Sequence, residues 1–347
     1  MFEIPEWPCF LGAPGASGLI RSSPEDFQVE EIPRVLPQGE GSHLWLWVEK
    51  RSANTDWVAR ELARVLQCSH RDVGYAGLKD RHALTRQWFS VPHTDTTREN
   101  LQAGVLQIND IEGVRLLEYQ SHNRKLKRGT LDGNRFRLKI RSFAGNPIDL
   151  QHRLEQIQAR GVPNYFGPQR FGHDGRNVRQ GYSLLKSGKR LARNKRSIYL
   201  SAIRSYMFNQ VLAQRVRLGN WDRIIDGDLA MLDGSQSIFP CEMPDTEIED
   251  RCSRHDIHPT GPLPGEAGTQ PTALAAKLEM EVLQGSPELV DLLVSKRVKA
   301  SRRALRLYPA ELEWSLQEDM FDLAFVLPAG TYATTVLREL LVYSAAN

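Results

Sequence analysis

Residues 79–82 place one carboxylate, Asp80, among three side chains that carry or can carry positive charge. A glycine-containing approach, residues 74–78, precedes them, and a strand-like stretch with bulky apolar side chains follows. Asp is common in solvated turns, so the tetrapeptide alone favours an exposed bend. Bends at the ends of buried strands are also where catalytic loops often lie. Asp80 is therefore either a turn residue or a carboxylate kept ionised for chemistry.

Several other chemistries lack the residue spacing that they need. The chain contains no GxxxxGK[ST], HExxH or GxSxG pattern, and the glycine-rich residues 12–18 include no lysine. Four cysteines without a CxxC pair do not make a disulfide framework, which favours a reducing cytoplasm. Zinc-ligand residue types occur late in the chain, but their C-x10-C-x2-H-x2-H spacing matches no common site: Cys241, Cys252, His255 and His258. We expect no metal site.

The net charge of +3 conceals a strong segregation of charge. Twelve Lys and Arg residues fall between Val162 and Arg217, eight between Ser121 and Arg141, and six between Lys296 and Arg306. The first two segments hold one acid each and the third holds none. Solvated helix faces explain one such run, but three runs favour a polyanionic partner such as nucleic acid, bound with release of counterions.

The first third of the chain alternates strand-like and helix-like segments. Strands are predicted at 27–32, 44–48, 87–91, 113–119 and 134–140. A helix is predicted to begin at Asn54 or Thr55, since either can cap it, and another spans 148–159 before Gly161.

The character changes after Gly161. Basic helical segments extend to about residue 218, and the proline-rich region 234–271 reads as loop. Helices are predicted at 271–284 and at 286–305, the second with Ser286 as its cap. A strand at 320–327 and a closing helix at 334–343 follow. At 347 residues the chain is long enough for two domains or for one domain with a large insertion. No run of about 18 apolar residues predicts a membrane helix, and the first residues do not resemble a secretory signal.

Five segments, in order, resemble the signatures of the TruD family of tRNA pseudouridine synthases. "GYAGLKDRHALTRQWFSV" resembles the signature built around a catalytic Asp. The other four segments are "PEDFQVEEI", "HNRKLKRGTLDGNRFRL", "GVPNYFGPQRFG" and "LPAGTYATTVLREL". Each motif is short, but five in the family's order over nearly the whole chain make a specific match.

The resemblance implies an α+β fold, with a mixed and mainly antiparallel sheet of the pseudouridine-synthase type flanked by helices. It assigns residues 1–160 and 308–347 to the catalytic domain and 161–307 to an inserted α/β domain that binds RNA. It also implies isomerisation of a tRNA uridine, uridine 13 in this family, to pseudouridine. The C–N glycosidic bond breaks and a C–C bond forms from C5, so the reaction needs neither cofactor nor metal.

Asp80 matches the catalytic aspartate of the family. A carboxylate beneath a flipped-out base is desolvated, which disfavours its charged form unless a cation opposes the effect. Arg21 occupies a place where the family pattern often has Lys, and we predict that it forms an ion pair with Asp80.

The resemblance also implies four substrate-site positions. Phe27, Asn134 and Phe136 match the family, with aromatic faces to stack on an extruded uracil and an amide to read its edge. Tyr332 falls where the family commonly has Phe, so its hydroxyl requires a partner. We expect Lys79 to contact RNA phosphate.

Two other functions remain open at this stage. A non-catalytic RNA-binding protein or RNA chaperone would share the basic segments but would not need Asp80. An RNA hydrolase using Asp80 with His82 would usually need a second carboxylate or a metal cluster. We further expect tRNA as the partner, no membrane association, no obligate protein partner, and a monomer.

Overall fold

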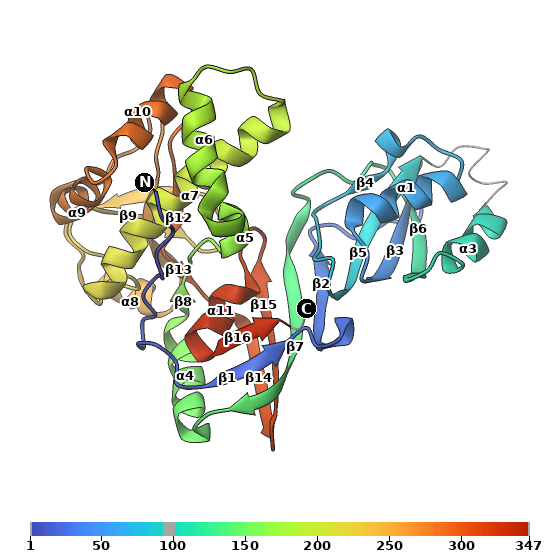
Figure 1. Cartoon of the computed structure of the whole chain (residues 1–347), viewed down its shortest axis with the longest axis horizontal. Helices are drawn as coiled ribbons and strands as arrows, with labels where there is room; N and C mark the ends of the chain where they lie inside the picture. The colour runs from blue at the N-terminus through green and yellow to red at the C-terminus, as the bar shows by residue number, and fades with distance from the viewer. Residues whose placement is uncertain (1, 93–100, 346–347) are drawn as a thin grey trace. The chain divides into compact units, whose positions relative to one another are not determined.

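The computed structural model describes residues 2–92 and 101–345, which divide into two compact units (Figure 1). Unit 1 comprises the described residues of Met1–Gly15, Ile148–Pro309 and Thr331–Leu341. Unit 2 comprises those of Ala16–Pro147, Ala310–Gly330 and Val342–Asn347. We describe each unit by itself.

Within the described residues, unit 2 holds a ten-stranded sheet that is mainly antiparallel. Its main path runs in the order β14 (Ala310–Gln317), β15 (Met320–Pro328), β7 (Leu131–Ala144), β2 (Phe27–Pro33), β5 (Leu84–Pro92), β3 (His43–Arg51) and β6 (Val114–His122). Pairing is parallel between β2 and β5 and antiparallel at the other steps of this path. Three short strands lie off the path: β1 (Ser17–Ile20), β16 (Val342–Ala345) and β4 (Gly74–Tyr75).

The alternation of side chains along β7 separates two faces of this sheet. Phe136, Leu138 and Ile140 point to the buried face, while Arg137 and Arg141 alternate with them. Elsewhere in unit 2, the helix α1 (Thr55–Val65) packs its apolar side against β3 and β5 and forms one core cluster with them. The helices α3 (Leu101–Asn109) and η1 (Pro24–Asp26), with η2 (His70–Asp72), complete this unit.

Unit 1 combines helices with a four-stranded sheet and a two-stranded one. Its helices are α4 (Pro147–Arg160), α5 (Pro168–Phe171), η3 (His173–Gly175), α6 (Arg176–Lys186), α7 (Arg193–Arg217), α8 (Thr246–Ser253), α9 (Ala273–Leu283), α10 (Pro287–Ser295) and α11 (Ala333–Leu340). The larger sheet has the order β10 (Ile238–Cys241), β9 (Asp228–Leu232), β11 (Ile257–Leu263), β12 (Ser301–Ala304), and β8 (Val162–Pro163) pairs with β13 (Arg306–Leu307). The central helix α7 buries residues such as Ile203, Phe208 and Leu212 in the core of this unit.

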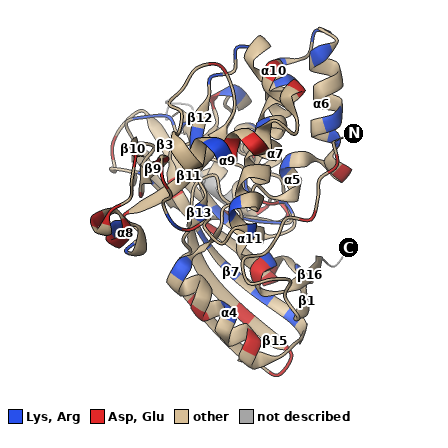
Figure 2. Cartoon of the chain, turned by 90° about the vertical axis from the view of Figure 1, so that its left-hand side faces the viewer, with Lys and Arg blue, Asp and Glu red and all other residues tan. Residues whose placement is uncertain are grey.

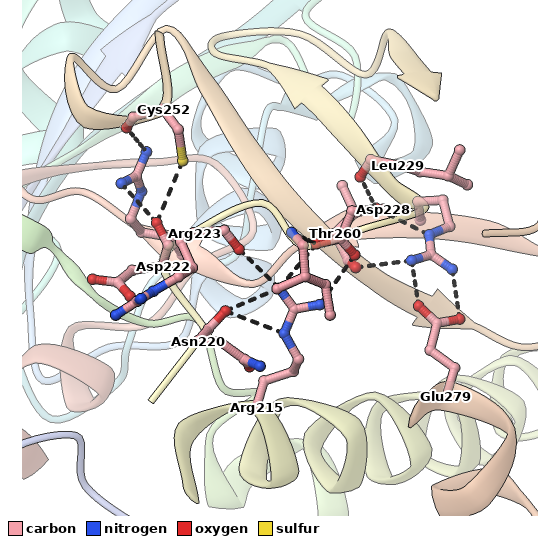
Figure 3. Close-up of polar contacts among 12 residues, drawn as sticks. Arg215, Asn220, Asp222, Arg223, Asp228, Leu229, Cys252, Thr260 and Glu279 are labelled. Atoms are coloured by element: carbon pink, nitrogen blue, oxygen red, sulfur yellow. Dashed lines mark hydrogen bonds and ion pairs between the residues drawn. The ribbon is translucent and has the colours of Figure 1, made fainter. Parts of the chain in front are cut away.

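Buried ion pairs tie these elements together (Figure 3). Arg215 of α7 donates to both carboxylate oxygens of Asp228, at 3.0 and 2.9 Å. Arg302 of β12 makes a bidentate contact with Glu279 of α9, and both side chains are less than a tenth exposed. Because a charge buried alone is costly, each of these arginines depends on its carboxylate.

The predicted fold class is confirmed, and so are most predicted elements of the first third of the chain. The prediction that 234–271 is loop was wrong, because β10, α8 and β11 lie there. Asp245 caps α8 by accepting from the Ile248 N–H at 2.9 Å. Pro259 and Pro262 are tolerated in β11 because each half of that strand pairs with one neighbour only.

Two helices predicted near the end of the chain are shorter than expected. The helix predicted over 286–305 is α10, which begins at Pro287 as expected but ends at Ser295. Residues 301–304 form β12, because pairing with β11 overrides their basic, helix-compatible composition. The closing helix likewise ends at Leu340, and β16 follows it.

The two compact units differ in their bounds from the predicted functional domains. Residues 2–15, 148–160 and 331–341 group with the inserted segment rather than with the large sheet. Grouping by compactness does not test which segments act together in catalysis, so the functional division stays a prediction. In the described part of the chain, no helix is both long and apolar enough to span a bilayer.

Candidate active site

Asp80 lies in an irregular segment, residues 76–83, that joins β4 to β5. Its side chain is 39% exposed, so the carboxylate can be reached from solvent. Trp88 and Phe89 on the following strand are buried, as predicted, whereas Leu78 is 67% exposed. The bend therefore lies at the end of a buried strand and also exposes the apolar side chain of Leu78.

Arg21 forms the predicted ion pair with Asp80. Its Nη2 atom lies 3.6 Å from Asp80 Oδ1, and the Arg21 side chain is 17% exposed. Arg21 follows β1 with a left-handed backbone conformation, φ of +58°, which is uncommon for a non-glycine residue. Its guanidinium also lies over the Phe27 ring, 4.0 Å from the ring centroid. The cation is thus fixed between an aromatic face and the carboxylate.

Two of the aromatic residues predicted for the substrate site, Phe27 and Phe136, lie on the buried face of the sheet. Phe27 and Phe136 meet edge to face with centroids 6.4 Å apart, and Phe136 contacts Phe325 at 5.4 Å. Phe27 is 1% exposed and Phe136 is 6% exposed. Arg21 occupies the ring face of Phe27 that a base would need, so in this conformation Phe27 supports Arg21.

The side-chain oxygen of Asn134 can still accept a hydrogen bond. This oxygen is buried and makes no hydrogen bond within residues 2–92 and 101–345. The residue lies on β7 opposite Glu31 of β2 and Leu327 of β15, on the same side of the strand as Phe136. A buried amide oxygen without a donor is costly to maintain, and a donor such as the N3–H of uracil would satisfy it.

Lys79 has a different environment from the one predicted. Its Nζ atom lies 2.9 Å from Glu31 Oε2, and the two side chains are 4% and 0% exposed. This geometry gives no support to a contact with RNA phosphate. It indicates instead that Lys79 anchors the segment 76–83 to β2.

Tyr332, which belongs to unit 1, has a partner for its hydroxyl. The Arg170 guanidinium donates to Tyr332 Oη from Nε and from Nη2, at 3.2 and 2.7 Å. Its ring contacts Phe166 edge to face. The hydroxyl that distinguishes Tyr332 from a phenylalanine is therefore accommodated by a local hydrogen bond.

Sequence reasoning missed three buried polar side chains behind the Asp80 segment: Lys50, Thr55 and Gln87. Each bonds to a backbone group of residues 77–80. The sequence offers little signal for them, since Lys50 lies between Glu49 and Arg51 and Gln87 follows Arg86, so both lie in polar stretches of their strands.

In two of the three basic segments, several Lys and Arg side chains form ion pairs within the chain or are buried. In 121–141, Arg135, Lys139 and Arg141 pair with carboxylates from other parts of unit 2. In 296–306, Arg302 and Arg306 are buried. Arg302 and Arg306 are therefore not available to a polyanion, whereas Arg135, Lys139 and Arg141 are partly exposed and only offset by their carboxylates.

The third segment keeps an exposed concentration of positive charge around the end of α6 and the start of α7. No acid occurs between Asp174 and Asp222 in the sequence. Seven basic residues there are exposed: Arg176, Lys186, Lys189, Arg190, Arg193, Lys195 and Arg196. Figure 2 shows the Lys and Arg colour at both ends of α6. We call residues 186–196 the basic hairpin.

A cavity of about 880 Å³ lies beside the Asp80 segment in unit 2. Residues on one side of α1, among them Trp57 and Arg64, line it together with Arg81. Arg81 is exposed.

The residues considered for zinc have other roles. All four cysteines of the chain are free thiols, and Cys252 Sγ donates to the Asp222 carbonyl at 3.4 Å. The His258 ring contacts Asp233 through one nitrogen and Arg306 through the other. The described residues contain no cluster of three or more potential metal ligands.

The fold is that of a solved TruD-type protein. A crystal structure described as a tRNA pseudouridine synthase D from Methanosarcina mazei matches with a TM-score of 0.73. The match covers 98% of this chain and 96% of the other, at 22% sequence identity.

Sequence comparison identifies the family. The family model for tRNA pseudouridine synthase D (TruD) matches residues 9–186 and 175–340. A tRNA pseudouridine synthase D from Methylococcus capsulatus is 45% identical, over 98% of this chain and 97% of its own length. The protein of that name from Nitrosococcus oceani is also 45% identical, over 94% and 91%. This chain belongs to the TruD family of tRNA pseudouridine synthases, which are isomerases.

Proposed function

We propose that this chain isomerises a uridine of tRNA to pseudouridine, that uridine 13 is the target, and that Asp80 is the catalytic carboxylate. The Asp80–Arg21 pair carries the proposal. It combines an accessible carboxylate with a guanidinium 3.6 Å away, at the edge of an aromatic cluster.

The reaction breaks the bond between C1′ and N1 and forms a bond between C1′ and C5. The C5 proton is lost to solvent and N1 gains a proton, so no atoms are added or removed overall. Asp80 can serve in two ways, by attack on C1′ or by removal of a sugar proton on the way to a glycal. Both need an ionised carboxylate held in a fixed position, and the Arg21 guanidinium contacts it directly.

Asn134 is assigned to uracil recognition. Its buried oxygen has no donor in the described structure, and the flipped base presents an N–H that could supply one. Phe136 and Phe27 then form the apolar floor beneath the amide and the Arg21 guanidinium. In this arrangement Phe27 acts on the substrate through Arg21.

Tritium release from tRNA labelled at uracil C5 tests the catalytic assignment. The chain should release tritium with the RNA strand intact and in the presence of EDTA, and Asp80→Asn should abolish release. Release that persists in Asp80→Asn would refute the role of Asp80. Binding of tRNA without any release in the unaltered chain would favour a non-catalytic RNA-binding protein. Position 13 is tested by mapping pseudouridine in the product.

The basic hairpin is assigned to the tRNA backbone. Lys195→Gln/Arg196→Gln removes two exposed charges and should weaken tRNA binding. It should also reduce the slope of log K against log salt by about 1–2. Arg135→Gln/Lys139→Gln is a matched control, because both charges are paired with carboxylates on the sheet. An unchanged slope in the first variant, or equal losses in both, would contradict the assignment.

We further propose that the protein acts in the cytoplasm and as a monomer. Four free thiols suit a reducing compartment. The molar mass in solution, measured by light scattering with and without tRNA, tests the expectation of a monomer.

A further inference from the structure

Three buried polar side chains hold the backbone of the Asp80 segment from behind. They come from three different elements: Lys50 from β3, Thr55 from the first turn of α1, and Gln87 from β5. Their exposed fractions are 0, 2 and 0%. We call these three residues the clamp.

Each clamp residue satisfies a backbone group close to Asp80. Lys50 Nζ donates to the Asp80 carbonyl at 2.8 Å, and the Lys79 N–H donates to Thr55 Oγ1 at 3.0 Å. Gln87 Nε2 donates to the Gly77 carbonyl at 3.0 Å. Thr55 also donates to Gln87 Oε1 at 3.1 Å, so two members of the clamp are joined.

Lys50 is the least expected member of the clamp. A second bond from its Nζ atom, 2.7 Å long, reaches the Ala53 carbonyl just before α1. The charged groups that act on it are Asp80, which favours its charge, and Lys79, which opposes it. Burial lowers the pKa of Lys50 to about 8, so the ammonium remains mostly charged at neutral pH. Both of its bonds are therefore charge-assisted, which makes them stronger than neutral ones.

A buried ammonium without a direct carboxylate contact is a poor way to stabilise a strand. An apolar side chain of similar length would fill the same place without the cost of desolvating a charge. Unlike an apolar residue, Lys50 provides a donor that bridges two carbonyls, that of Ala53 just before α1 and that of Asp80.

We infer that Lys50 is a positioning residue for the reaction, and that together with Thr55 and Gln87 it presets the backbone of the Asp80 segment before RNA binds. This inference rests on the proposed role of Asp80. Lys50 donates its hydrogen bond to the carbonyl of Asp80, and its charge acts on the Asp80 carboxylate only from a distance. The clamp leaves the side chain free to pair with Arg21 and to meet the substrate.

The main test compares Lys50→Met with the unaltered chain at pH 7. Misplacing a reacting group by about 1 Å can reduce a rate on the order of 100-fold. We expect a loss in kcat of about that size, with KM for tRNA little changed. Hydrogen exchange followed by mass spectrometry should show faster exchange in peptides covering residues 76–83. Peptides from unit 1 should exchange as before. Unchanged kcat, or a loss of kcat without faster exchange in this segment, would overturn the inference.

Thr55 supplies a second test in case Lys50→Met fails to fold. Thr55→Val removes the hydroxyl that accepts from Lys79, whereas Thr55→Ser keeps it. We expect Thr55→Val to lower kcat and to loosen the segment, and Thr55→Ser to restore both. Equal behaviour of these two variants would contradict the clamp. If the unaltered chain forms no pseudouridine, the proposed function fails, while the exchange comparison still decides whether the clamp holds the segment.

Discussion

Replacing Arg21 by methionine removes the cation that forms an ion pair with the Asp80 carboxylate. At 3.6 Å, the attraction between the two charges is about 1 kcal/mol at the dielectric constant of water and about 5 kcal/mol at an effective value of 20. With side-chain exposures of 17 and 39%, the pair lies between these limits. We take about 2 kcal/mol for the loss of the contact that holds the Asp80 carboxylate in place, which corresponds to roughly 30-fold in rate.

The measurement is the single-turnover rate of pseudouridine formation with tRNA bound to saturation. Arg21→Met should have a much lower single-turnover rate, while its affinity for tRNA should change little. Arg21→Lys keeps the charge, and lysine is the residue that the family pattern often has here, so this variant should retain most of the rate. Phe27→Leu removes the ring beneath the guanidinium but keeps the ion pair. The loss in this variant therefore measures the cation–π contact alone, about 0.5–1 kcal/mol.

Two results would refute this reasoning. One is a single-turnover rate for Arg21→Met close to that of the unaltered chain. The other is a loss in Arg21→Met that appears only as weaker tRNA binding, which would make Arg21 a contact for RNA.

Three further predictions concern unit 1. Burial raises the pKa of Glu339 from its ordinary value of 4.5 to about 7, so between these two pH values the folded chain keeps a proton that the unfolded chain releases. The free energy of unfolding should therefore fall by about 3 kcal/mol as pH rises from 4.5 to 7. Urea unfolding measures this fall, which should be absent in Glu339→Gln. Arg302→Met leaves Glu279 buried without its partner and should lower the free energy of unfolding by about 3–5 kcal/mol. Adding Glu279→Leu should restore the melting temperature, and a double variant that does not recover would contradict this. Tyr332→Phe removes the acceptor of Arg170 but keeps the ring, so it should cost about 1 kcal/mol of stability, with pseudouridine formation retained; loss of activity without loss of stability would assign the hydroxyl to the reaction.

Local sequence was sufficient where periodicity and motif coincide. The alternation along β7 predicted a strand with one buried face, and the order of five motifs predicted the family. Prediction failed where pairing between distant segments decides the structure. Residues 234–271 contain prolines and polar residues that favour loop, but β11 forms because β9 and β12 lie on either side of it. A single stretch of sequence does not contain that information.

The candidate site divides in the same way. Resemblance to the family's motifs suggested Asp80 and Asn134, which lie within contiguous signatures, and Arg21, which lies just before one, and these roles stay predictions. Lys50 and Gln87 are far from Asp80 in the sequence, and only the pairing of β3 with β5 brings them behind its segment.

By itself the sequence determined the family, the order of the motifs and the residues able to do the chemistry, because these depend on which side chains occur and in what order. Tertiary structure decided which charges remain available. It buried Lys79 against Glu31 and Arg302 against Glu279, and it left the basic hairpin exposed. Whether a cation is free to meet RNA depends on the carboxylates that folding brings within about 4 Å of it, and those carboxylates come from elsewhere in the chain.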